Sequence, residues 1–186
     1  YVDLVWEKTN VQPRISWHFK TPKPMPSSID YAALRVLAYM LSSEKSDLQM
    51  DLVYAQEAVA RTVSARAGNQ VDAALFSIDI MLTSTSDIEQ VEARVFTELS
   101  NLKNADPTVV LASKNALLRS QKMLLTSPDR WAFVIGRTVA QFNDITALQQ
   151  QLEQIEAVTV DDISMVLDKY FHPESMIRAT LRGEVQ

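Results

Sequence analysis

The two histidines are the first residues to consider for chemistry, because imidazole serves both as a zinc ligand and as a general base. His18 and His172 lie far apart in the chain, and neither belongs to an H-x-x-E-H helix, which would point two imidazoles at one metal ion. The chain contains no cysteine, so thiolate zinc sites, disulfides and cysteine nucleophiles are excluded. The sequence therefore predicts no zinc site, no resident cofactor and no catalytic residues in this chain.

Other catalytic patterns are also missing. No G-x-S-x-G turn presents a serine nucleophile, and three glycines in the whole chain disfavour glycine-rich phosphate loops. Paired carboxylates occur, as at Asp161 and Asp162 or at Glu89 and Glu92, but they fall at expected helix starts or on polar helical faces. We interpret them as helix-stabilising or solvated groups rather than as an acid–base pair.

Charge and hydropathy exclude two further classes of function. The 186 residues carry a formal net charge of −5, and the sequence contains no cluster of consecutive Lys and Arg residues. Both observations argue against nucleic-acid binding. No apolar stretch is long enough to span a bilayer. Residues 1–7 lack the basic start of a secretion signal, and the first residue is not Met. We expect residues 1–186 to be a single domain excised from a longer chain.

Two expected strands carry the only polar cluster that suggests binding. In residues 14–20 and again in 177–182, odd positions are apolar and even positions are polar, as in strands with one buried face. If the strands are neighbours, their polar sides form a basic patch that faces away from the helices. We interpret this patch as a candidate wall of a peptide-binding cavity, with a solvated sheet face as the alternative. Its members are Arg14, His18, Lys20, Arg178 and Arg182.

The remaining elements follow from periodicity and capping signals. Residues 2–7 are expected to form a short strand, and 59–66 with 71–82 a hairpin. Helices are expected over 28–42, 47–54, 87–103, 107–125, 128–142, 145–156 and a final segment that ends at His172. Capping pairs are expected at Ser27/Asp30, Ser86/Glu89 and Thr159/Asp162. This order predicts an α+β fold, a mostly antiparallel sheet with helices packed on one face.

Several segments in this order resemble the non-catalytic domain of the pitrilysin/insulinase family of zinc metallopeptidases, which includes mitochondrial processing peptidase. The resemblance covers approximately residues 1–184. The segments that carry it are Ile29–Leu34, Leu41–Ser43, Ser46–Leu48, Thr126–Arg130, Val158–Ile163 and Tyr170–Ser175.

The resemblance implies an inactive domain that completes a substrate chamber and helps to bind unfolded peptides. Zinc and hydrolysis would be supplied by a zinc-bearing domain of the same chain or of a partner chain, in a bacterial protein that is periplasmic or secreted. Some relatives supply an Arg and a Tyr, seven residues apart, to the zinc site. The corresponding positions here are Val53 and Ala60, so this assistance is not expected.

Two alternatives come from other classes of function. The chain could be a structural or assembly subunit with no link to proteolysis, and an H-x-x-E-H helix upstream in the full-length protein would distinguish the two. It could also be an independent hydrolase that uses His18, in which case His18→Ala would abolish its activity. Exposed sheet edges make a homodimer of the isolated chain a further expectation.

Overall fold

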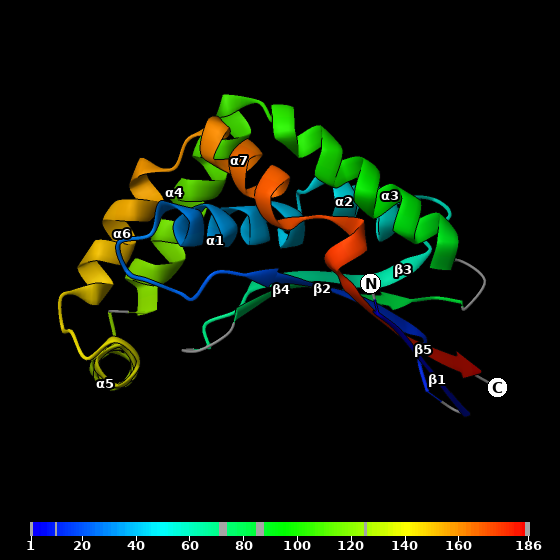
Figure 1. Cartoon of the computed structure of the whole chain (residues 1–186), viewed down its shortest axis with the longest axis horizontal. Coiled ribbons are helices and arrows are strands. Elements are labelled where there is room, and N and C mark those ends of the chain that lie inside the picture. Colours follow the sequence, from blue (N-terminus) through cyan, green and yellow to red (C-terminus); the bar gives the residue numbers. More distant parts are fainter. Residues whose placement is uncertain (1, 10, 71–73, 85–87, 125, 185–186) are drawn as a thin grey trace.

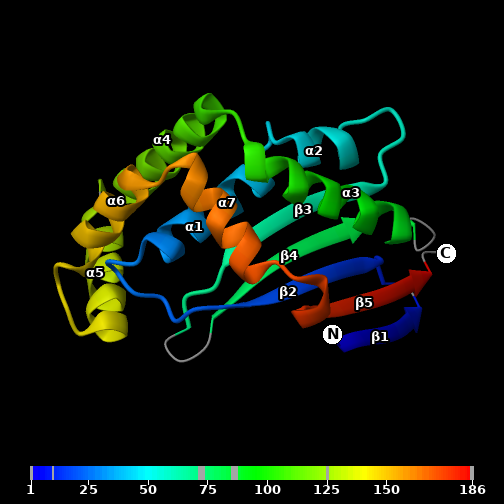
Figure 2. The same ribbon diagram turned by 45° about the horizontal axis from the view of Figure 1, so that its top comes forward.

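A five-stranded mixed sheet with the order β1-β5-β2-β4-β3 forms one layer of the structure, and helices form the other (Figures 1 and 2). The computed structural model describes residues 2–9, 11–70, 74–84, 88–124 and 126–184. β2 pairs antiparallel with β4 and β5, β3 pairs antiparallel with β4, and β1 pairs parallel with β5. The expected α+β class is confirmed. The strands are β1 (Val2–Thr9), β2 (Arg14–Thr21), β3 (Ala60–Ala67), β4 (Ala74–Leu82) and β5 (Ile177–Glu184).

The helices lie on one face of the sheet, and no described helix covers the other face (Figure 1). We call the uncovered side the outer face. All expected helices are present, with ends shifted by a few residues. They are α1 (Ile29–Ser42), α2 (Asp47–Leu52), α3 (Ile88–Asn101), α4 (Pro107–Leu124), α5 (Pro128–Phe142), α6 (Ala147–Ala157) and α7 (Val160–Tyr170), with short 3₁₀ turns at Leu102–Asn104 and Pro173–Ser175.

The hydrophobic core lies between the sheet and the helices. The apolar side chains of β2, Ile15, Trp17 and Phe19, are completely buried there, as their alternation predicts. Phe171, which follows α7, places its ring centroid 4.7 Å from that of Phe19 and 4.9 Å from that of Phe76. These aromatic contacts fix the end of α7 against the middle of the sheet.

Of the three expected capping pairs, the structure confirms one and contradicts one. At α7 the Thr159 hydroxyl accepts a bond from the backbone NH of Asp162, whose carboxylate accepts one from the backbone NH of Thr159, so this capping box is confirmed. The pair expected at Ser27 and Asp30 is wrong, because Ser28 is the residue that caps α1. Of the third expected pair, Ser86 lies outside the described residues.

The carboxylate of Asp30 takes part in a tertiary contact instead. It accepts hydrogen bonds from Lys169 Nζ at 2.8 Å and from Tyr170 Oη at 2.6 Å, and so ties the start of α1 to the end of α7. Burial raises the pKa of Asp30, but these two hydrogen bonds and the lysine charge together lower it below its ordinary value.

Candidate functional site

The register between β2 and β5 divides the five candidate residues between the two faces of the sheet. Arg14, His18 and Lys20 lie on the outer face, where β2 pairs His18 with Ile177 of β5. Arg178 pairs with the buried Trp17, so it lies on the helix-covered face. Arg182 alternates with Leu181 and lies on that same face. The strands are neighbours as expected, but the common basic patch does not form.

Arg178 faces inward because a carboxylate on α3 receives it. Its Nη1 lies 2.6 Å from Glu92 Oε2, and Trp17 Nε1 donates to Glu92 Oε1 at 3.2 Å. The ring of Phe96, one turn further along α3, meets the Trp17 ring edge-on at 6.5 Å. Arg178 and Glu92 therefore position α3 over β2 and β5, which is a role within the domain. The alternation expected in residues 177–182 is present, but its polar side lies on the helix-covered face and not on the face away from the helices.

The β2 part of the outer face is polar and internally hydrogen-bonded. Ser16 donates to Asp79 Oδ1 on β4 at 2.6 Å, and His18 Nδ1 lies 2.8 Å from Ser77 Oγ. His18 is half-buried, whereas the cationic side chains of Arg14 and Lys20 at the two ends of β2 are exposed. The centre of this face offers polar groups that already have protein partners, and its charge lies at the ends of the strand.

The other part of the outer face is an apolar strip formed by β1 and β5. The parallel register places Leu4 beside Ala179 and Trp6 beside Leu181, all on this face. Trp6 is 55% exposed, although aromatic side chains of this size are usually well covered. A contiguous exposed apolar surface is typical of a binding site in a soluble protein. We define the apolar strip as Val2, Leu4, Trp6, Ile177, Ala179 and Leu181.

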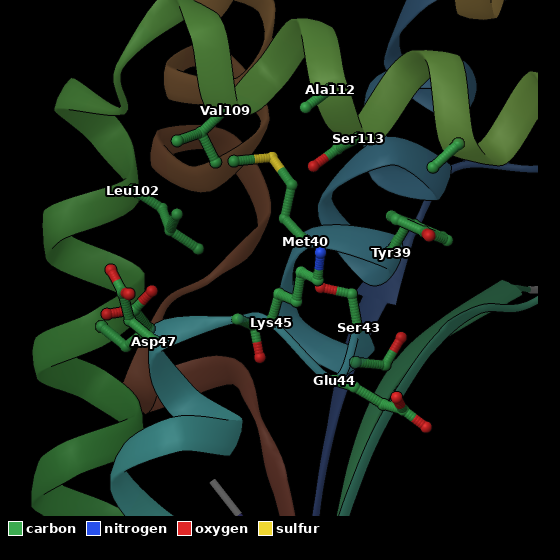
Figure 3. A pocket seen from close by; sticks show the side chains of 14 residues that line it. Tyr39, Met40, Ser43, Glu44, Lys45, Asp47, Leu102, Val109, Ala112 and Ser113 are labelled. Carbon is green, nitrogen blue, oxygen red and sulfur yellow. The ribbon is translucent and has the colours of Figure 1, made fainter.

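A cavity of about 650 Å³ opens on the helical side, between α1, the start of α2, α3 and α4 (Figure 3). Met40 extends from α1 toward Val109 and Ser113 of α4 (Figure 3). The opposite side of the cavity carries Asp47 and Glu98. Burial raises the pKa of Glu98, the negative charge of Asp47 raises it further, and a hydrogen bond with Asn101 opposes them. The sequence alone does not reveal this cavity, because its lining comes from four elements that are separate in the chain.

The described residues do not fit a zinc site. His18 is held against Ser77 on the outer face, whereas His172 is exposed after α7. No group of three or more His, Cys, Asp or Glu side chains in the described part of the chain could hold a metal ion. None of the described helices combines the length and the apolar character that crossing a membrane requires.

With this geometry in view, comparison with known proteins identifies the family. Residues 3–116 match the family model of the peptidase M16 inactive domain, so the chain belongs to that family. No curated protein matches the chain. The expected resemblance to a non-catalytic domain of this peptidase family is confirmed.

Solved structures show the same fold at low sequence identity. A protease from Helicobacter pylori superposes with a TM-score of 0.85 at 20% identity, over 97% of this chain and 43% of that chain. The inactive peptidase domain of a predicted zinc protease from Bordetella parapertussis gives 0.78 at 16% identity, over 92% of both chains. The periplasmic protease PqqL from Escherichia coli gives 0.70 at 15% identity, over 98% of this chain and 20% of that chain. The chain therefore spans less than half of the Helicobacter protein and nearly all of the Bordetella domain.

Proposed function

We propose that this domain forms one wall of a peptide-binding chamber, which it completes together with a zinc-bearing domain of the same chain or of a partner chain. Hydrolysis takes place on that partner, and this domain contributes surface. Membership of the inactive-domain family supports the division of labour. The observation that carries the proposal is the uncovered outer face, where an apolar strip lies beside a polar strand with charged ends.

The two parts of the outer face suit an unfolded peptide in different ways. Trp6 and Leu4 offer apolar area to side chains that a folded protein would bury, which stabilises binding without regard to sequence. Arg14 and Lys20 attract acidic segments from the ends of β2. Arg178 is left out of the wall, because Glu92 already binds it on the other face.

The test uses the full-length parent protein together with its zinc-bearing domain and a fluorogenic unfolded peptide. Trp6→Ser with Leu4→Ser removes most of the exposed area of the apolar strip on β1, and we expect KM to rise about tenfold while kcat changes little. Trp131→Ser is the matched control, because Trp131 is 44% exposed on α5, away from the sheet. An unchanged KM in the double variant would refute the chamber-wall role.

Two further observations separate the rival functions. A parent protein that lacks an H-x-x-E-H helix and cleaves no peptide would favour a structural or assembly subunit. Turnover by this chain alone that is lost in His18→Ala would favour an independent hydrolase.

We also propose a periplasmic or secreted bacterial location, supported by the periplasmic Escherichia coli protease of the same fold. Two copies of the isolated chain could form a homodimer by pairing their exposed β1 edges. Analytical ultracentrifugation of the isolated chain, which measures its sedimentation, tests this.

A further inference from the structure

A second cavity, of about 510 Å³, lies at one end of the molecule, between α1, α4, α5, α6 and the end of β3. Figures 1 and 2 show α5 lying at this end, distant from β1 and β5. The charged residues that line the cavity are all arginines, namely Arg35, Arg66 and Arg137, and no Asp or Glu lines the part that the structure describes. The cavity lining is therefore positively charged, although the chain as a whole has a net charge of −5. We call it the arginine cavity.

Arg35 is a half-buried cation whose hydrogen-bond partner among the described residues is neutral. It projects from α1 with its guanidinium carbon 6.0 Å from the ring centroid of Tyr31, and its Nη1 donates to the neutral Gln151 Oε1 at 3.1 Å. A guanidinium has five N–H donors, and within the described residues no carboxylate pairs with this one. Burying a cation without a counter-charge is unfavourable. The position is stable in the chain as it stands, but an added anion would stabilise it further.

Arg137 brings a second positive charge to the same place. It extends from α5, with its guanidinium carbon 6.0 Å from the ring centroid of Phe133, and it is exposed. Burial lowers the pKa of Arg35, and the charge of Arg137 lowers it further, whereas Tyr31 opposes both. Two arginines that line one cavity, with no Asp or Glu among its described lining residues, form an anion site of the kind that arginine clusters provide.

The rest of the lining indicates what carries the anion. Neutral amide side chains of Gln121 and Gln151 can pair with peptide groups, and Leu117, Val134 and Phe142 supply apolar area. A bare oxyanion would leave this apolar lining without contacts. The volume lies within the range of small-ligand pockets.

We propose that the arginine cavity binds a carboxylate group of a peptide, held by the guanidinium groups of Arg35 and Arg137. The carboxylate comes either from an acidic side chain or from a C-terminal end. The cavity lies apart from the apolar strip, so the inference stands or falls independently of the chamber wall.

Calorimetric titration of the chain with four probes tests this assignment. Three are acetylated leucine-containing hexapeptides, which carry glutamates and an amidated end, glutamines and a free end, or glutamines and an amidated end. The fourth is inorganic phosphate. We expect one or both carboxylate peptides to bind in a salt-sensitive manner and the neutral peptide not to bind. The stronger of the first two identifies the source of the carboxylate.

Variants assign the binding to the cavity. Arg137→Gln leaves the core unchanged because Arg137 is exposed, and we expect it to weaken the peptide about ten- to a hundredfold, as Arg35→Gln should. Arg130→Gln removes the same charge from an exposed position of α5 that does not line the cavity, and should leave affinity unchanged. Failure of both carboxylate peptides to bind, equal binding of the neutral peptide, or equal weakening by Arg130→Gln would overturn the proposal. Phosphate that binds more tightly than either peptide would overturn its peptide part.

Discussion

Replacing Glu92 by glutamine tests the inward orientation of Arg178 most directly. The substitution keeps the shape of the side chain and retains an oxygen that can accept from Trp17 Nε1, but it removes the charge that faces Arg178. The two side chains of the ion pair are 20% and 22% exposed, so the pair lies between the exposed and the buried extremes. Exposed pairs contribute up to about 1 kcal/mol, and breaking a fully buried pair costs about 3–5 kcal/mol.

We therefore expect Glu92→Gln to lower the free energy of unfolding by about 2 kcal/mol, or the melting temperature by about 4–8 °C. Glu92→Ala should cost about 1 kcal/mol more, because the buried Trp17 NH then loses its acceptor. Urea unfolding followed by tryptophan fluorescence and circular dichroism measures both changes.

The controls decide between an ion pair and a general effect of losing a carboxylate. Glu57→Gln makes the same chemical change at an exposed loop position and should stay within about 0.5 kcal/mol of the wild type. A double-mutant cycle with Arg178→Gln should give a coupling of at least about 1 kcal/mol. If Glu92→Gln lowers the free energy of unfolding no more than Glu57→Gln does, or if the coupling energy is zero, then Arg178 does not hold α3 in place.

The remaining predictions concern pH and capping. Asp30 has a lowered pKa in the folded state, so its stabilisation is present above about pH 4 and is lost as the pH falls through the folded pKa; Asp30→Asn should therefore differ from the wild type at pH 7 and converge with it in acid. Glu98 has a raised pKa, so folding loses stability as the pH rises through it; Glu98→Gln should be the more stable protein at pH 7, and this gain should disappear below about pH 4. Unfolding measured across pH checks both signs, and curves that run parallel to the wild type would contradict them. Thr159→Ala should cost about 1 kcal/mol by removing the cap of α7, whereas Thr97→Ala, on the exposed side of α3, should cost nothing measurable.

Local patterns predicted most of the fold because they report on a residue and its near neighbours in the chain. The alternation around Trp17 identified β2, and the Thr159 capping box placed the start of α7. The neighbouring serine that caps α1 shows the limit of such signals, since Ser27 and Ser28 are both chemically suitable and only the backbone geometry selects Ser28.

The candidate site was harder to predict because its faces depend on register. Alternation in β5 shows that Ile177 and Arg178 point in opposite directions, but only the pairing of Arg178 with Trp17 decides which direction is inward. The polar side of β5 turned inward because Glu92 offers it a partner, and the apolar side became part of the apolar strip. The arginine cavity was invisible for a related reason, since Arg35 and Arg137 are brought together by helices that are distant in sequence.

The parallel pairing of Val2 with Ile177 has a consequence for biosynthesis. The first strand of this domain cannot find its hydrogen-bonding partner until the ribosome has completed nearly the whole domain. Until then the backbone of β1, with Trp6, stays available to chaperones and to other chains. The closing of this edge is therefore the step at which we expect nascent molecules to be most vulnerable to misassembly.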